Sequence, residues 1–120
     1  MRDLHAAWFY VAVAATGLAG LWGLVLAAVR RRPGRSFTVA AWVAAAAMLA
    51  QVGMGLALYA DEAWREAVPG FHVFYGMVIL FVFAFAYIFR VQVERRPALV
   101  WGVLLLFVMG LGLRAWSIAG

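Results

Sequence analysis

Four long runs of apolar residues, separated by short charged breaks, make up most of this chain of 120 residues. Each run is close to the ~20 residues that a helix needs to cross the ~30 Å hydrocarbon layer of a membrane. The runs are too long and too uniformly apolar for the ~10-residue alternating strands of a membrane barrel. The pattern therefore predicts an all-α polytopic membrane protein. We expect one four-helix transmembrane bundle over residues 1–120, with helices at about 4–29, 37–60, 71–89 and 97–118.

Charge adds an orientation to this picture. Hydrophobic side chains make up 68% of the chain and charged ones only 12%, and the net charge is +5. The positive charge is concentrated in the breaks that follow the first and third runs, which contain Arg30, Arg31, Arg32 and Arg35, and Arg90, Arg95 and Arg96. The positive-inside rule predicts that these breaks are cytoplasmic, so both chain ends and the break at 61–70 face outward. Topology thus explains the charge, and we expect a bacterial plasma (inner) membrane protein with no nucleic-acid partner.

The chain contains no cysteine. This excludes disulfides, thiolate nucleophiles, iron–sulfur clusters, cysteinyl zinc sites and covalently attached c-type haem. No Asp or Glu lies within an apolar run, which argues against a proton-coupled small transporter. The interior polar groups are few, and no nucleophile has a base within one helical turn, so a soluble-type enzyme is not expected.

The only two histidines, His5 and His72, point to a chemistry. Each lies in the first turn of an apolar run, and the first and third runs cross the membrane in the same direction. In a four-helix bundle these two helices can face each other across the core. Two imidazoles on facing helices are the usual ligands of a b-type haem in a membrane bundle. We therefore expect His5 and His72 to bind haem iron near the outer face.

Two further residues are candidates for the same site. Gly76 follows His72 by one helical turn on the same face, where a side chain would meet a porphyrin. Arg114 is expected at the same outer level, where its guanidinium can bind haem propionates or lipid headgroups. Gln51 is expected to mark the bundle interior, with Gly55 one turn further outward. Trp64 is expected to belong to the belt of aromatic residues at the outer interface.

The chain also resembles one half of haem A synthase. The resemblance covers about residues 4–90 and rests on His5, on Gln51 to Gly55, and on the segment Phe71-His72-Val73-Phe74-Tyr75-Gly76. In that family each four-helix half has a histidine at the outer end of one helix, a glutamine and glycine in the next, and a second histidine after them. The resemblance implies that His5 and His72 are axial haem ligands, with Gln51 and Gly55 packed beneath.

The chain departs from that family in several places. It has Arg2 where the catalytic half has an acidic residue, and Ala6 where that half has an arginine. It also has half the length of the family, and its fourth helix follows the matched three instead of preceding them. The resemblance therefore implies a haem-binding half-bundle for electron transfer or haem handling. It does not imply haem hydroxylation.

Other interpretations of the histidines remain open. His5 can be an ordinary interfacial residue, and His72 can cap a helix or form a hydrogen bond with an acid of the outer break, namely Asp61, Glu62 or Glu66. Asp3, Asp61 or Glu62 could instead join the histidines in a zinc or copper site. The main alternative function is a haem-free accessory subunit of a respiratory or photosynthetic complex. Its glycine-rich faces would contact other membrane subunits or further copies of the chain.

Overall fold

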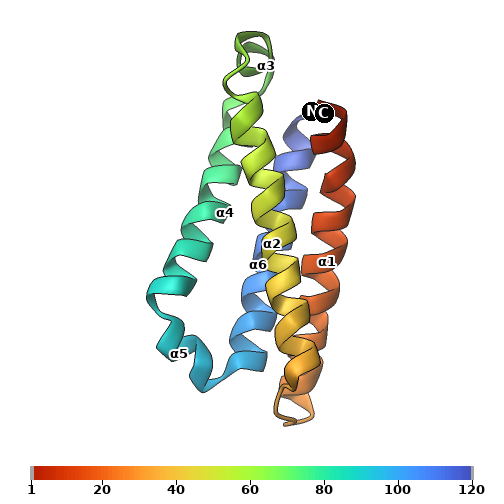
Figure 1. Ribbon diagram of the computed structural model, residues 1–120, viewed down its shortest axis with the longest axis vertical. Coiled ribbons are helices and arrows are strands. Elements are labelled where there is room, and N and C mark those ends of the chain that lie inside the picture. Colours follow the sequence, from red (N-terminus) through yellow and green to blue (C-terminus); the bar gives the residue numbers. More distant parts are fainter. Residues whose placement is uncertain (1, 120) are drawn as a thin grey trace.

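Each of the four apolar runs folds as one long helix in the computed structural model, which describes residues 2–119 (Figure 1). The four are α1 (Arg2–Ala28), α2 (Arg35–Leu58), α4 (Gly70–Ile88) and α6 (Pro97–Ala119). All four are long and apolar enough to cross a membrane. The all-α four-helix architecture is therefore confirmed, with helix boundaries within a few residues of those expected.

The two breaks that were expected as loops each contain one short helix, α3 (Glu62–Ala67) and α5 (Arg90–Arg95). The Asp61 carboxylate caps α3, since its Oδ1 accepts a hydrogen bond from the Ala63 backbone N–H at 3.0 Å. Pro69 precedes the first residue of α4, and Pro97 is the first residue of α6. Both positions suit proline, whose missing N–H has no partner at a helix start.

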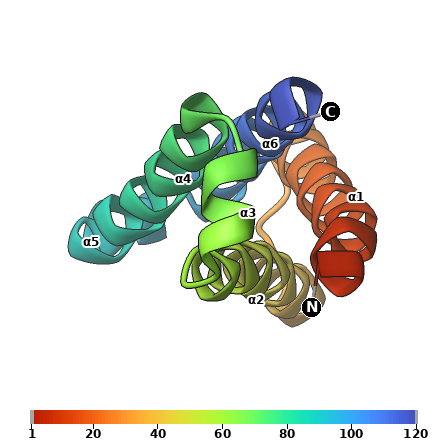
Figure 2. The same cartoon turned by 90° about the horizontal axis from the view of Figure 1, so that it is seen from above.

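The helices surround a core in which α1 and α4 lie diagonally opposite (Figure 2). α1 packs against α2 and α6, and α4 packs mainly against α6. As expected, α1 and α4 run in the same direction. One end of the bundle therefore carries α3 and both described chain ends, and we call it the terminal end. The opposite end carries α5 and the arginine-rich breaks, and we call it the arginine end (Figure 1).

Glycines bring α1 and α6 into backbone contact. A Cβ atom added at Gly23 would lie 2.7 Å from the Ala98 carbonyl oxygen and 2.9 Å from Gly102 Cα. One added at Gly102 would lie 2.8 Å from the Leu24 backbone nitrogen and 3.0 Å from the Gly20 carbonyl oxygen. Small residues allow this approach, on which helix association in lipid depends. These glycines pack within the chain, so they do not form the outward docking face that the accessory-subunit alternative required.

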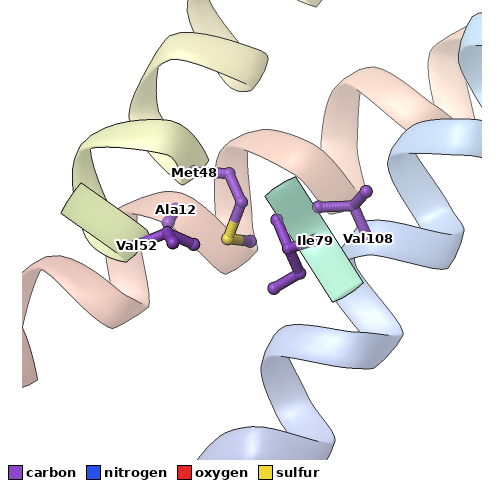
Figure 3. Packing of buried hydrophobic residues seen from close by; sticks show 5 residues of the cluster. All are labelled: Ala12, Met48, Val52, Ile79 and Val108. Carbon is purple, nitrogen blue, oxygen red and sulfur yellow. The ribbon is translucent and has the colours of Figure 1, made fainter. Parts of the chain in front are cut away.

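The buried core is continuous between α1, α2 and α6, and α4 contributes little to it. Ile79 is the only buried residue of α4. It packs with residues from the three other long helices in one cluster (Figure 3), which contains Ala12, Met48, Val52, Ile79 and Val108. A second cluster, closer to the arginine end, contains Ala19, Phe37, Ala41, Ala44 and Leu105, none of them from α4. α4 is therefore the least firmly packed of the long helices.

One side-chain hydrogen bond joins α1 to α2. The indole Nε1 of Trp8 donates to the Ala47 carbonyl oxygen at 2.8 Å in a partly buried position. We expect Trp8→Phe to lower the free energy of unfolding by roughly 0.5–1 kcal/mol, because it removes this bond and keeps most of the ring. Detergent unfolding followed by circular dichroism measures the change. Trp42→Phe is the matched control, because Trp42 is 61% exposed on α2; equal losses in both variants would contradict the prediction.

Candidate functional site

The two histidines meet at the terminal end of the bundle. His5 lies in the first turn of α1 and His72 in the first turn of α4, and both helices begin at this end. α1 and α4 are not packed side by side. The two imidazole rings nevertheless lie with their centroids 6.2 Å apart and their planes at 88°. The structure thus brings together two residues that are 67 positions apart in the chain.

A third ring completes this cluster. The Trp64 ring of α3 lies 6.1 Å from His5 and 6.3 Å from His72, centroid to centroid, in edge-to-face orientations. The three centroids therefore form a nearly equilateral triangle. Trp64 is therefore about equally far from both imidazoles and contacts each of them from the α3 side. α3 has no buried residue; besides Trp64, Arg65 holds this short helix, since its guanidinium donates to the Tyr59 carbonyl oxygen at 3.3 Å.

A backbone carbonyl orients His72. Its Nδ1 lies 2.9 Å from the Ala115 carbonyl oxygen of α6. A carbonyl oxygen can only accept, so Nδ1 must carry the proton and donate. The Nε2 atom of the neutral ring then has a lone pair, which is the state of a histidine that binds a metal while its other nitrogen is held by a partner. The hydrogen-bond partner of His72 is Ala115 and not Asp61, Glu62 or Glu66.

His5 and Gln51 are incompletely satisfied. The His5 Nδ1 and the Gln51 Oε1 are both buried, and neither has a hydrogen-bond partner in the described part of the chain. Gly55 makes room for His5, because a Cβ added there would lie 3.1 Å from the His5 Cε1. Buried polar atoms without partners are rare and often mark a position for water or a ligand. Gln51 therefore lies in the bundle interior beside His5, with Gly55 one turn further along, as expected.

The histidines line a cavity between all four long helices and α3. The enclosed cavity has a volume of about 80 Å³ and opens outward. Most of its walls are apolar or aromatic, and Phe9 and Trp116 stack there at 5.4 Å. Gly76 lines the same cavity one turn from His72, and a Cβ added there would have no atom within 4 Å. Gly112 lines it on the α6 side.

The other charged candidates do not join the histidines. Arg114 is exposed and is not among the residues that line the cavity. Within residues 2–119, no group of three or more His, Cys, Asp or Glu side chains is placed to hold a metal ion. The alternative in which Asp3, Asp61 or Glu62 joins the histidines in a zinc or copper site is therefore not supported by the arrangement of residues 2–119. Among the residues that line this cavity, His5 and His72 are the only ones of the types His, Cys, Asp and Glu.

The structure adds residues to the site that the sequence pattern did not reveal. Trp64 was expected at the interface, but the fold of α3 places it against both imidazoles. Met48 and Met77 bring two thioethers to the cavity wall. The Ala115 carbonyl is a backbone group, so no residue type signals its role. The Asp61 cap before Glu62 was the one local signal for a helix at α3.

Comparison with known proteins identifies no relative. No protein-family model matches the chain, and neither a curated protein nor a solved structure is significantly similar to it. The function of the site must therefore be argued from the chain's own residues.

Proposed function

We propose that this protein is an integral membrane protein that binds one b-type haem through His5 and His72. The observation that carries the proposal is the convergence of two imidazoles, without a third conventional ligand, in one apolar cavity. A structural zinc site needs four protein ligands, so two histidines are too few. A haem supplies four nitrogens of its own and needs only the two axial positions from the protein.

The spacing and surroundings of the rings support this proposal. Two imidazoles that bind one metal through nitrogens at about 2 Å have centroids roughly 6 Å apart, and the observed separation is 6.2 Å. The bond from His72 to Ala115 keeps the Nε2 lone pair available. Gly55, Gly76 and Gly112 reduce the bulk of the cavity wall, and aromatic side chains cover much of the remainder. These features suit a planar apolar cofactor.

Trp64 must adjust when such a cofactor binds. It lies against both imidazoles, and the enclosed cavity of about 80 Å³ is smaller than a haem, so Trp64 would have to move for His5 and His72 to hold the group. None of the α3 residues is buried, so the contacts to be broken are those of Trp64 and Arg65. Arg114 is exposed and precedes Ala115, the residue whose carbonyl holds His72. We assign its guanidinium to haem propionates or lipid headgroups.

A bound haem would supply one-electron chemistry, which fits a role in electron transfer or haem handling. The chain itself holds the iron ligands, fixes the tautomer of His72 and keeps the surroundings apolar. The positive-inside rule places the terminal end, and therefore the haem, on the outer side of a bacterial plasma membrane. We do not assign a catalytic step to this chain.

Haem titration of the detergent-purified protein tests the proposal. We expect saturation at one haem per chain and a six-coordinate, low-spin absorption spectrum in the oxidised and dithionite-reduced states. His5→Ala and His72→Ala should each lose this spectrum, because either change removes one axial ligand.

The control for the titration is Gln92→Ala, which removes an exposed polar side chain of α5 at the other end of the bundle. It should bind haem as the wild type does, and circular dichroism should show equal helix content in all four proteins. A wild-type spectrum that stays featureless after haem addition would overturn the proposal. So would a six-coordinate spectrum that survives both histidine replacements.

A copper(I) ion is the second candidate, because Met48 and Met77 line the same cavity. Thioethers and imidazoles are both suitable ligands for copper(I). Competition with a copper(I) chelator distinguishes the two functions. Under the haem proposal, Met48→Leu and Met77→Leu leave the haem spectrum unchanged. Under the copper proposal, the same variants weaken copper(I) binding and the wild type takes up no haem.

A further inference from the structure

A second cavity lies at the arginine end, far from the histidines. It is a groove of about 950 Å³, including its open side, between the end of α1 and the junction of α5 and α6. Four arginines line it, Arg30, Arg31 and Arg32 from one break and Arg96 from the other. The haem proposal uses none of these residues. The groove therefore requires its own explanation.

The charge of this end is strongly one-sided. Seven of the ten arginines lie in or beside α5 and the break between α1 and α2, whereas Glu94 is the only acid there. Glu94 is on α5 and does not line the groove. The four other acids lie at the terminal end: Asp3 is in α1, Asp61 caps α3, and Glu62 and Glu66 are in α3. Glu94, two residues before Arg96, is thus the only carboxylate close in sequence to a groove arginine, and this end of the bundle has an excess of positive charge.

Backbone hydrogen bonds hold the segment that begins at Arg30 close to the end of α1. Arg30 N–H donates to the Ala27 carbonyl at 3.2 Å, and Arg31 N–H donates to the Leu26 carbonyl at 2.9 Å. This is the usual closure of a helix by a residue in the left-handed region, and Arg30 has φ of 57°. Glycine is the residue that adopts this conformation most readily, and any other residue there is strained. The chain places an arginine at this position instead.

The other wall of the groove is apolar. It consists of Ala27 at the end of α1, Pro33, and the first turn of α6, which contributes Pro97, Ala98 and Leu99. α1 and α6 are in backbone contact here, since a Cβ added at Gly23 would lie 2.7 Å from the Ala98 carbonyl oxygen. The groove therefore joins a cationic rim to the apolar surface of two membrane-spanning helices. This combination matches a molecule with an anionic head and apolar chains.

We propose that this groove is a binding site for the headgroup of an anionic phospholipid. The guanidinium groups of Arg30, Arg31, Arg32 and Arg96 bind the phosphodiester, and the acyl chains follow the apolar surface of α1 and α6. Guanidinium groups bind phosphate oxygens through paired hydrogen bonds. Basic pockets between helices at the cytoplasmic face of a membrane bind lipid headgroups in this way. A zwitterionic lipid offers the same phosphate, but its own cation is repelled by the arginines.

Native mass spectrometry of the full chain tests the site. The protein is released from nanodiscs of phosphatidylglycerol and phosphatidylcholine in equal parts, and the retained lipids are counted. We expect the wild type to retain phosphatidylglycerol preferentially. Arg31→Gln combined with Arg96→Gln should reduce this preference about tenfold or more, because two cationic contacts to the anionic headgroup are lost.

The matched control is Arg2→Gln combined with Arg65→Gln, which removes the same charge at the terminal end. It should retain phosphatidylglycerol as the wild type does. Equal loss in both double variants, or no loss in either, overturns the proposal. If the Arg31 and Arg96 variant does not keep its helix content, Arg96→Gln alone replaces it, with a smaller loss as the supporting result and none as the opposing one.

Free phosphate is the other source of this chemistry, and a separate arm distinguishes it. Inorganic phosphate is added to the wild type in detergent, with sodium chloride at equal ionic strength as the reference. Retention of phosphatidylglycerol that is the same in both salts supports a lipid site. Displacement of the lipid by phosphate but not by chloride overturns it, because the groove would then bind the free anion. The outcome does not depend on haem binding at the terminal end.

Discussion

Gly23→Leu and Gly102→Leu are each expected to prevent stable packing of α1 on α6. At both positions the nearest atoms to an added Cβ are backbone atoms of the opposite helix, at 2.7 to 3.1 Å. Backbone atoms cannot move aside as the end of a side chain can, so the helices must separate. We expect a loss of about 3 kcal/mol or more in unfolding free energy, at the upper end of overpacking effects. Detergent unfolding followed by circular dichroism measures it.

Gly53→Leu is the matched control for this prediction. Gly53 is an exposed glycine within α2, and a Cβ added there has no atom within 4 Å. The change from glycine to leucine should be neutral or slightly stabilising, because leucine has the higher helix propensity. A loss of stability at Gly53 that equals the loss at Gly23 would show that backbone approach between α1 and α6 is not the cause.

Gly76→Phe is expected to block haem binding while the bundle remains folded. Gly76 lines the cavity one turn from His72, and a Cβ atom added there has no neighbouring atom within 4 Å. A phenyl ring there would fill space that the proposed cofactor needs. We expect haem affinity to fall about tenfold or more, which corresponds to a loss of about 1.4 kcal/mol in binding free energy. Haem titration of the purified variant measures the change.

Ala84→Phe provides the comparison for Gly76→Phe. Ala84 is exposed on the same helix and does not line the cavity. This variant should bind haem with wild-type affinity, and both variants should keep the unfolding midpoint of the wild type. Wild-type haem affinity in the Gly76 variant would contradict a cofactor seated against α4.

The fold could be predicted from sequence because four uninterrupted apolar runs of this length are compatible with few structures other than four membrane-spanning helices. In lipid every backbone N–H and C=O must be bonded within the protein, and a helix does this without a partner strand. The lengths of the runs then fixed the four long helices to within a few residues. α3 and α5 were missed because each has only six residues, and polar segments of that length carry no periodicity from which to identify a helix.

The pairing of His5 with His72 was also accessible to sequence reasoning. It needed only the direction of each helix and the assumption that the first and third apolar helices face each other. The partners of the histidines were not accessible. Ala115 holds His72 through its carbonyl, and Trp64 reaches the site because α3 folds over the end of the bundle. Such contacts depend on how each helix is rotated about its own axis. The nearly uniform apolar surface of these helices does not determine that rotation.

Arg114 illustrates the same limit. Its depth along α6 could be inferred, but its direction could not, and its side chain is exposed outside the cavity. The glycines of α1 illustrate a related limit. The sequence offered glycine-rich faces as contacts with other subunits, whereas the structure packs the α1 glycines against α6 of the same chain. A pattern of small residues reveals that a helix is approached closely, whereas the identity of the approaching helix depends on the whole arrangement.

The contact between α1 and α6 has a consequence for how the protein is made. α1 is the first described helix to leave the ribosome, and α6, its main packing partner, is the last. Contacts between segments so distant in sequence form late. Until α6 has been inserted, the glycine face of α1 has no partner within its own chain. During that interval the nascent protein depends on α2 and on the insertion machinery to shield α1, so a pause in synthesis before Pro97 would leave the bundle open to incorrect association.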